Sequence, residues 1–209
     1  MATFKSTTFG KISGKFGDAL ATQSKATGKN YLRVASVPSN PRTEKQVEHR
    51  AKFGFINSVL RPFYPVFKTN FGGGNQGIRY GINRAFKEAI VGEYPEFSID
   101  LTSLVFSEGS IDKAANTLLS KTVDGKVKLD WDTTVLLNSS NNDRINLVFY
   151  NENADQTLAL YPETNRSVGT YDVEIPAIWA GSTIHCWMYF ISANDSSFSN
   201  SQYINSVEF

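Results

Sequence analysis

The sequence predicts an α+β protein, in which a basic, glycine-rich β arm and two helices are followed by an antiparallel immunoglobulin-like β-sandwich. Two hydrophobic patterns and one charge pattern support this prediction. Hydrophobic residues recur at helical spacing between residues 43 and 91, and they alternate with a period of two after residue 97. Residues 1–97 contain 15 Lys and Arg against 6 Asp and Glu, whereas residues 98–209 contain 6 against 14. We therefore expect one domain over residues 1–97 and a second over residues 98–209.

Residues 1–37 form the predicted arm. Glycine–lysine pairs recur in this segment, at Gly10-Lys11, Gly14-Lys15 and Gly28-Lys29, and short hydrophobic pieces lie between them. Glycines that interrupt extended segments are typical of short strands with bulges and bends. The arm has too few apolar side chains to form a core alone. Its strands therefore need a partner, either in the rest of the same chain or in a second copy.

Two helices are predicted between the arm and the sandwich. The first covers about residues 43–61, because Thr43 and Gln46 have the spacing of a capping box, and it is expected to stop at the two prolines that follow, Pro62 and Pro65. The second covers about residues 76–91, where hydrophobic residues recur at helical spacing. Asn75 has the side chain of an N-cap for this second helix.

Alternating hydrophobic residues predict about seven short strands after residue 97. The alternation is found at residues 97–101, 127–131, 145–149, 158–160, 171–175, 184–190 and 203–209. Asp124-Gly125 is a strong hairpin signal between two hydrophobic runs. Short strands separated by turns at regular intervals are typical of an immunoglobulin-like sandwich.

The composition bounds the class of protein. A hydrophobic fraction of 41% and an aromatic fraction of 13% are sufficient for a packed core, so the chain is not a disordered segment. The one cysteine, Cys186, cannot form an intramolecular disulfide or a cysteine-based metal site. No segment approaches the ~18 apolar residues that span a bilayer, and Met-Ala-Thr-Phe-Lys does not begin a signal peptide. We expect a cytoplasmic or particle-associated protein, with an extracellular filament left open.

Two glycine motifs resemble phosphate-binding loops. The segment 72–77, Gly-Gly-Gly-Asn-Gln-Gly, fits the dinucleotide fingerprint G-x-G-x-x-G, but that fingerprint requires a preceding strand and a parallel sheet, which the pattern does not predict. We interpret it as a loop that begins a helix. Gly14-Lys15 fails the phosphate-loop spacing, and Phe16 stands where that loop needs a hydroxyl.

The titratable residues do not form a catalytic or metal-binding pattern. His185 and Cys186 are neighbours on a strand, so their side chains point to opposite faces. A pairing of Cys186 with the second histidine, His49, is left open. Asn151, Asn153 and Asp155 resemble the start of a calcium loop, but the glycine and the distant glutamate of that loop are missing. We predict no enzyme activity, no cofactor and no metal.

The basic residues of the arm have three interpretations. Basic residues interleaved with aromatic ones suit nucleic-acid binding, but there is no recognition-helix pattern and no run of consecutive positive charges. The lysines can instead flank edge strands and protect them from uncontrolled pairing. They can also contact the acidic sandwich of a neighbouring copy. The predicted assembly interface consists of Phe4, Phe9, Ile12, Phe16, Tyr31, Lys11, Lys15 and Arg33.

Several motifs carry a resemblance to a known family. They are GKISGKFG at residues 10–17, NYLR at 30–33, NPRTxxQ at 40–46 and IWAG at 178–181. Together they resemble a widespread uncharacterised family of Bacteroidota proteins of about this length. The N-terminal pattern is also similar to that of small proteins from phage and prophage gene neighbourhoods. The resemblance implies an α/β N-terminal part, a C-terminal sandwich and a role in building particles or filaments, and it implies no functional residues.

The function predicted from the sequence is that of a non-enzymatic structural subunit. The arm would pair with a neighbouring copy, and the opposite charges of the two parts would favour head-to-tail contacts. The product would be a fibre or a component of a phage-related particle, and the partner would be the protein itself. The alternative is a binding module whose basic N-terminal part holds nucleic acid.

Overall fold

The computed structural model describes residues 2–4, 13–35, 42–122 and 126–209. The chain divides into two compact units, Met1–Thr43 and Glu44–Phe209. The boundary therefore lies between residues 43 and 44, whereas the sequence pattern predicts it between 97 and 98. The reason is that the helices share a hydrophobic core with the sandwich, so they fold as part of the same unit.

The N-terminal unit is a four-stranded antiparallel sheet with the order β1-β4-β3-β2. Its strands are β1 (Ala2–Phe4), β2 (Gly14–Phe16), β3 (Ala19–Gln23) and β4 (Asn30–Val34). Gly17 and Asp18 connect β2 to β3 as a two-residue hairpin loop, and Gly17 has a φ of 55°, which glycine adopts without strain. The arm thus pairs its strands within its own chain.

The larger unit contains an antiparallel β-sandwich. One sheet has the order β10-β9-β12-β13 and the other the order β11-β8-β7. The strands are β7 (Leu118–Lys121), β8 (Val127–Asp130), β9 (Arg144–Asn151), β10 (Gln156–Leu160), β11 (Thr170–Val173), β12 (Thr183–Ile191) and β13 (Gln202–Glu208). This arrangement confirms the predicted α+β class with a sandwich. The predicted turn at Asp124-Gly125 lies outside the described residues.

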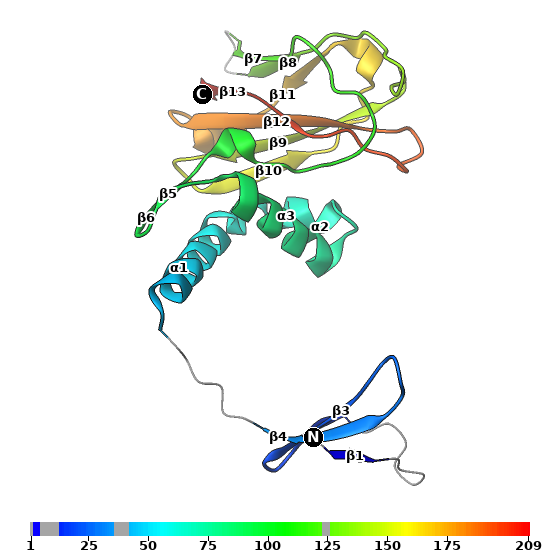
Figure 1. Ribbon diagram of the computed structural model, residues 1–209. Helices are drawn as coiled ribbons and strands as arrows, with labels where there is room; N and C mark the ends of the chain where they lie inside the picture. The colour runs from blue at the N-terminus through cyan, green and yellow to red at the C-terminus, as the bar shows by residue number, and fades with distance from the viewer. Residues whose placement is uncertain (1, 5–12, 36–41, 123–125) are drawn as a thin grey trace. The chain divides into compact units, whose positions relative to one another are not determined.

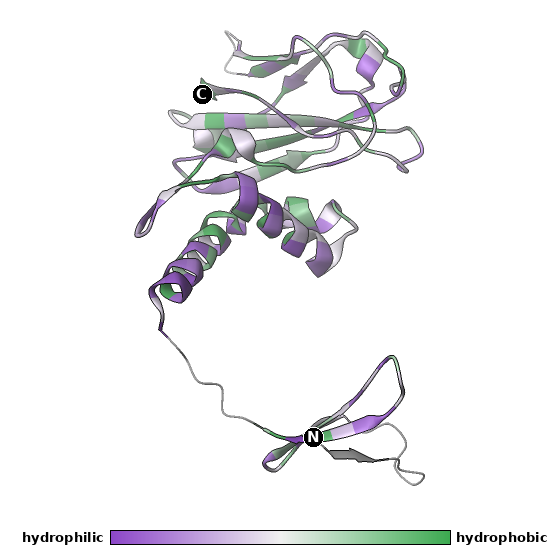
Figure 2. Cartoon of the chain, viewed as in Figure 1, coloured by the Kyte–Doolittle hydropathy of each residue, from purple (hydrophilic) through white to green (hydrophobic). Residues whose placement is uncertain are grey.

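Three helices cover the outer face of the β10-β9-β12-β13 sheet (Figure 1). They are α1 (Glu44–Val59), α2 (Tyr64–Thr69) and α3 (Gly74–Glu88), with the hairpin β5 (Ile90–Glu93) and β6 (Glu96–Ile99) after them. Hydrophilic residues predominate in the first half of α1 (Figure 2). Ile56 is the one buried residue of this helix. The first and last helices confirm the two predicted ones within a few residues.

The central strands β9 and β12 are buried on both faces, which explains how one sheet serves two cores. On β12, Cys186 and Met188 point into the sandwich, whereas Trp187 and Tyr189 point toward the helices. Phe63, from the 3₁₀ turn Arg61–Phe63, contributes to the helical layer, where its ring lies 4.8 Å from that of Tyr150 and 6.1 Å from that of Trp187 between centroids.

The helix α2 was not predicted from the sequence. The prolines at 62 and 65 were expected only to stop a helix, but each occupies the first turn of a new helical segment. Proline is tolerated there because the first amide groups of a helix have no intrahelical partner. The expected N-cap of α3, Asn75, lies inside that helix, and Gly73 with a φ of 83° takes the cap position.

Candidate assembly surfaces

The N-terminal sheet has two chemically different faces. Antiparallel pairing puts Phe16, Ala19 and Val34 in one row across the sheet, and Lys15, Leu20 and Arg33 in the next. Adjacent rows point to opposite faces of a sheet. Ala21 and Leu32 fall on the side of Phe16, whereas Tyr31 falls on the side of Lys15. The same register puts Gln23 and Asn30 on the first side, at the opposite end of β3 and β4 from Phe16. We call the remainder of the first side the apolar face (Phe16, Ala19, Ala21, Leu32, Val34) and the second side the basic face (Lys15, Leu20, Tyr31, Arg33).

Much of the apolar face is exposed to solvent. The exposed fraction is 66% for Phe16, 79% for Val34 and 38% for Leu32, whereas Ala21 is buried. Large apolar side chains gathered on one exposed surface are typical of sites that contact another molecule. Among the described strands, β1 and β2 form the two edges of this sheet, and the outer backbone groups of an edge strand can pair with further strands.

The structure separates the predicted interface residues into different places. Lys15 and Arg33 lie together on the basic face with Tyr31, and Phe16 lies on the opposite face. Phe4 is the last residue of β1, where it pairs with Asn30. The other predicted residues, Phe9, Lys11 and Ile12, lie outside the described residues. The sequence prediction did not include Leu32 and Val34 in the interface. Their alternation with Tyr31 and Arg33 already indicates that they lie together on the face opposite to those two residues.

The helical layer contains an apolar pocket between α1 and α3. The cavity has a volume of about 370 Å³ and is lined by His49, Phe53, Arg79, Ile82, Asn83 and Phe86. The rings of His49 and Phe86 are 5.3 Å apart between centroids, and Lys52 Nζ lies 5.1 Å from the centroid of Phe86. Phe53 is 52% exposed. The pocket therefore combines an apolar lining with the guanidinium of Arg79, and the ammonium group of Lys52 lies beside it.

The loop between β8 and β9 exposes three consecutive apolar residues, which we call the loop tip (Val135, Leu136 and Leu137). Their exposed fractions are 41%, 55% and 96%. Hydrogen bonds fix the loop on both sides of the tip. Asp132 Oδ1 accepts from the amide of Thr134 at 2.8 Å, and Asp112 Oδ2 accepts from the amide of Asn138 at 2.8 Å.

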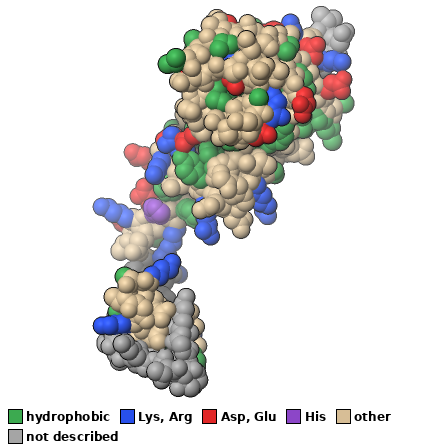
Figure 3. Space-filling model, turned by 90° about the vertical axis from the view of Figure 1, so that its right-hand side faces the viewer, with side chains coloured by type: hydrophobic (Ala, Val, Ile, Leu, Met, Phe, Trp, Pro, Cys, Tyr) green, Lys and Arg blue, Asp and Glu red, His purple; other side chains and the backbone are tan. Residues whose placement is uncertain are grey.

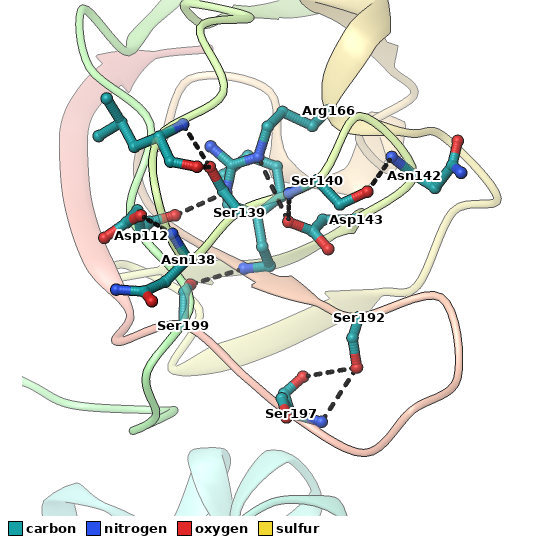
Figure 4. A network of polar contacts seen from close by, with 12 residues as sticks. Asp112, Asn138, Ser139, Ser140, Asn142, Asp143, Arg166, Ser192, Ser197 and Ser199 are labelled. Carbon is teal, nitrogen blue, oxygen red and sulfur yellow. Dashed lines mark hydrogen bonds and ion pairs between the residues drawn. The ribbon is translucent and has the colours of Figure 1, made fainter.

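A buried arginine fixes the base of this loop (Figure 4). The side chain of Arg166 is fully buried, and Nη2 donates to the carbonyl oxygen of Asp112 at 2.6 Å. Its Nε lies 3.6 Å from Oδ2 of Asp143, which also accepts from the amide of Ser140 at 2.7 Å. The guanidinium carbon lies 3.7 Å from the ring centroid of Phe190. Desolvation lowers the pKa of Arg166, and Asp143 and Asp112 partly offset that effect.

The structure places Cys186, His185 and His49, which the sequence analysis considered for catalysis, in three different surroundings. The thiol of Cys186 is fully buried between the two sheets, and this burial raises its pKa far above the usual range. His185 instead contacts Tyr203 through Nδ1 at 3.0 Å and Glu152 through Nε2 at 3.4 Å. His49 lines the helical pocket, so the structure does not bring it together with Cys186.

The polar residues of the resembled calcium loop also have structural roles. Asn151 Oδ1 accepts from the amide of Ala154, Asn153 Oδ1 accepts from the amide of Thr183, and Asp155 accepts from the hydroxyl of Tyr150. Each side chain therefore closes the turn between β9 and β10 or ties it to β12. Across the described parts of the chain, no cluster of three or more His, Cys, Asp or Glu has the arrangement of a metal site.

The glycine-rich segment 72–77 serves helix packing. The element before it is the helix α2, not the strand that a dinucleotide site requires. Gly72, Gly73 and Gly74 all have positive φ, which turns the chain sharply between α2 and α3. At Gly77 a Cβ atom would overlap the carbonyl oxygen of Phe67, so a glycine there permits α3 to approach α2 closely.

The comparisons with known proteins identify the family of this chain. Residues 11–205 match the model of the family of unknown function DUF6266, and the protein therefore belongs to that family. This confirms the predicted membership of an uncharacterised family. No curated protein and no solved structure matches the chain significantly. Within the described residues, no helix has both the length and the apolar character needed to cross a membrane.

Proposed function

We propose that this protein is a non-enzymatic structural subunit that assembles with copies of itself through its N-terminal sheet. The observation that carries the proposal is the exposed apolar face, on which Phe16 and Val34 are more than half exposed. Stacking two such faces removes this apolar surface from water, which favours association by about 25 cal/mol per Å². The edge strands β1 and β2 offer a further route by strand addition.

The separation of charge supports head-to-tail contacts in addition. Residues 1–43 contain 7 Lys and Arg and 1 Asp, a net charge of +6, and residues 44–209 have a net charge of −5. Within the larger unit, Lys and Arg side chains gather over the helices and most carboxylates lie over the sandwich (Figure 3). Opposite charges on two parts of one subunit attract the unlike parts of two copies. We propose a fibre or a phage-related particle component as the product.

Light scattering of the full chain over a concentration series tests the proposal. We expect oligomers whose mass falls in the double variant Phe16→Ser/Val34→Ser, because the variant removes the two most exposed apolar side chains of the face. Ile178→Ser is the matched control, since Ile178 is 84% exposed but belongs to the larger unit. Raising the salt concentration should weaken the assembly by screening the charges.

Two results would contradict this function. One is a strict monomer at every protein and salt concentration. The other is an assembly whose mass is unchanged in Phe16→Ser/Val34→Ser, because the apolar face would then play no part.

Nucleic-acid binding is a second candidate because of the basic face. Lys15 and Arg33 are exposed on it, and Tyr31 lies on the same side. Cations beside an aromatic ring suit the phosphates and bases of a single strand. A gel shift with a single-stranded oligonucleotide that is lost in Lys15→Glu/Arg33→Glu and kept in Phe16→Ser/Val34→Ser would favour this candidate.

A further inference from the structure

We propose that the loop tip of one copy inserts into the pocket between α1 and α3 of a second copy. This inference rests on the proposed function, and it identifies one contact through which the subunits assemble. The occupant of the pocket is thus residues 135–137 of another molecule of the same chain.

The loop tip has the properties of a rigid apolar anchor. Leu137 is 96% exposed, the highest exposure of the large hydrophobic residues that the structure describes. The turn is not free to fold its leucines back onto the sandwich, because Ser139 Oγ accepts from the amide of Leu136 at 2.7 Å and Asp112 holds the amide of Asn138. A loop whose backbone is already held in place loses less conformational entropy on binding than a free one.

The pocket has the complementary properties. Its apolar lining consists of Ile82 and the rings of Phe53 and Phe86, and its volume of about 370 Å³ lies in the range of cavities that bind apolar groups. Arg79 and His49 are polar residues of the same lining. An apolar anchor that enters such a cavity excludes water from its contacts and acts as the centre of an interface.

The charges around the two surfaces are also complementary. Asp112 and Asp132 lie at the base of the loop tip, and both carboxylates are partly exposed. Arg79, His49 and Lys52 lie around the pocket. When the anchor enters the pocket, acidic groups approach basic ones around a desolvated apolar centre.

The two surfaces belong to different layers of the larger unit. The pocket lies in the helical layer, on one face of the β9–β12 sheet, whereas the loop follows β8, which packs on the other face. Two different patches of this kind make a heterologous contact, in which each copy offers one free loop and one free pocket. Such contacts form rings if the rotation closes and filaments if it does not.

Disulfide trapping in the full chain tests the contact directly. The native thiol of Cys186 is fully buried, so engineered cysteines react without competition from it. We mix Leu137→Cys with Phe53→Cys under diamide, which oxidises two neighbouring thiols to a disulfide. We expect a covalent dimer in at least about tenfold excess over the control mixture of Ile178→Cys with Phe53→Cys. Leu137→Asp should weaken assembly about tenfold or more, as is usual for the centre of an interface.

The outcomes separate this inference from the proposed function. If Phe16→Ser/Val34→Ser abolishes assembly while Leu137→Asp leaves it intact and the cross-link equals the control, the contact is wrong and the function stands. If the wild-type chain is a monomer throughout, both fail. Binding of the chain to phosphatidylserine vesicles that is lost in Leu137→Asp, with no cross-link above the control, would assign the loop to a lipid surface and overturn the inference.

Discussion

Replacing Arg166 by methionine should destabilise the larger unit by several times as much as the loss of an exposed ion pair. The guanidinium is fully buried, and it is the cation that faces the carboxylate of Asp143, which is itself only 4% exposed. Methionine keeps an apolar stem of similar length. It removes the charge, the hydrogen bond to the carbonyl oxygen of Asp112 and the contact with the ring of Phe190.

The size of the effect follows from the buried carboxylate. Removing one partner of a buried ion pair costs about 3–5 kcal/mol, because the remaining charge is left without compensation. Asp143 keeps the hydrogen bond from the amide of Ser140, and the pair is 3.6 Å apart, which is longer than a hydrogen bond. We therefore expect the lower end, about 3 kcal/mol. For a unit of this size that corresponds to a fall in Tm of roughly 6–12 °C.

Thermal unfolding by circular dichroism measures this effect against a matched control. Arg144→Met removes another arginine–aspartate pair, but Asp195 in that pair is 64% exposed, so its loss should cost less than about 1 kcal/mol. Adding Asp143→Asn to Arg166→Met neutralises the stranded carboxylate and should restore most of the stability. Equal losses in Arg166→Met and Arg144→Met, or no recovery in the double variant, would refute the reasoning.

Three further predictions concern the fold. A chain that begins at Glu44 should keep the main unfolding transition of the full chain, since every residue of the two cores lies in the larger unit; calorimetry of both chains checks this. Gly77→Ala should cost more than about 2 kcal/mol in urea unfolding, because its Cβ would overlap Phe67, whereas Gly54→Ala in α1 meets open space and should stabilise by up to about 1 kcal/mol. Asp100→Ala should cost about 1 kcal/mol at pH 7 through loss of the cap to Thr102. Hydrogen bonds from Ser103 and Thr102 lower the pKa of Asp100 below its ordinary value of 3.8. The stability difference between Asp100→Ala and the wild type is therefore complete above pH 5 and becomes smaller as the pH falls toward the folded-state pKa, which urea unfolding over a series of pH values below 7 measures.

Much of the sandwich could be predicted from the sequence because its strands follow local rules. The alternation of Ile184, Cys186, Met188 and Phe190 matches the row that faces the second sheet. The intervening Trp187 and Tyr189 are equally buried, however, and an alternating pattern does not say what covers the second face. The covering residues, such as Phe63 and Phe67, lie more than a hundred positions earlier in the chain. The sequence therefore placed the helices in a separate domain.

The candidate surfaces were harder to predict for the same reason. The pocket combines His49 and Phe53 of one helix with Ile82 and Phe86 of another, and only the packing of α1 against α3 brings them together. In the N-terminal sheet, Lys15 and Phe16 are adjacent in the sequence, but the strand period puts them on opposite faces. The sequence prediction therefore grouped into one interface residues that lie on opposite faces of the sheet.

The two proposed contacts have different symmetries, and their combination determines what the subunit can build. Stacking of two apolar faces is a contact between identical patches, which closes after two copies. Insertion of the loop tip into a pocket joins different patches, so it continues from copy to copy. A subunit with only the first contact stops at a dimer, and one with only the second forms a single ring or filament. In a subunit with both contacts, the face-to-face dimers cross-link the chains of subunits that the loop contact forms. Leu137→Asp removes the loop contact, so the protein should then form only dimers. Phe16→Ser/Val34→Ser removes the stacking contact, so the protein should then form only unbranched chains or rings.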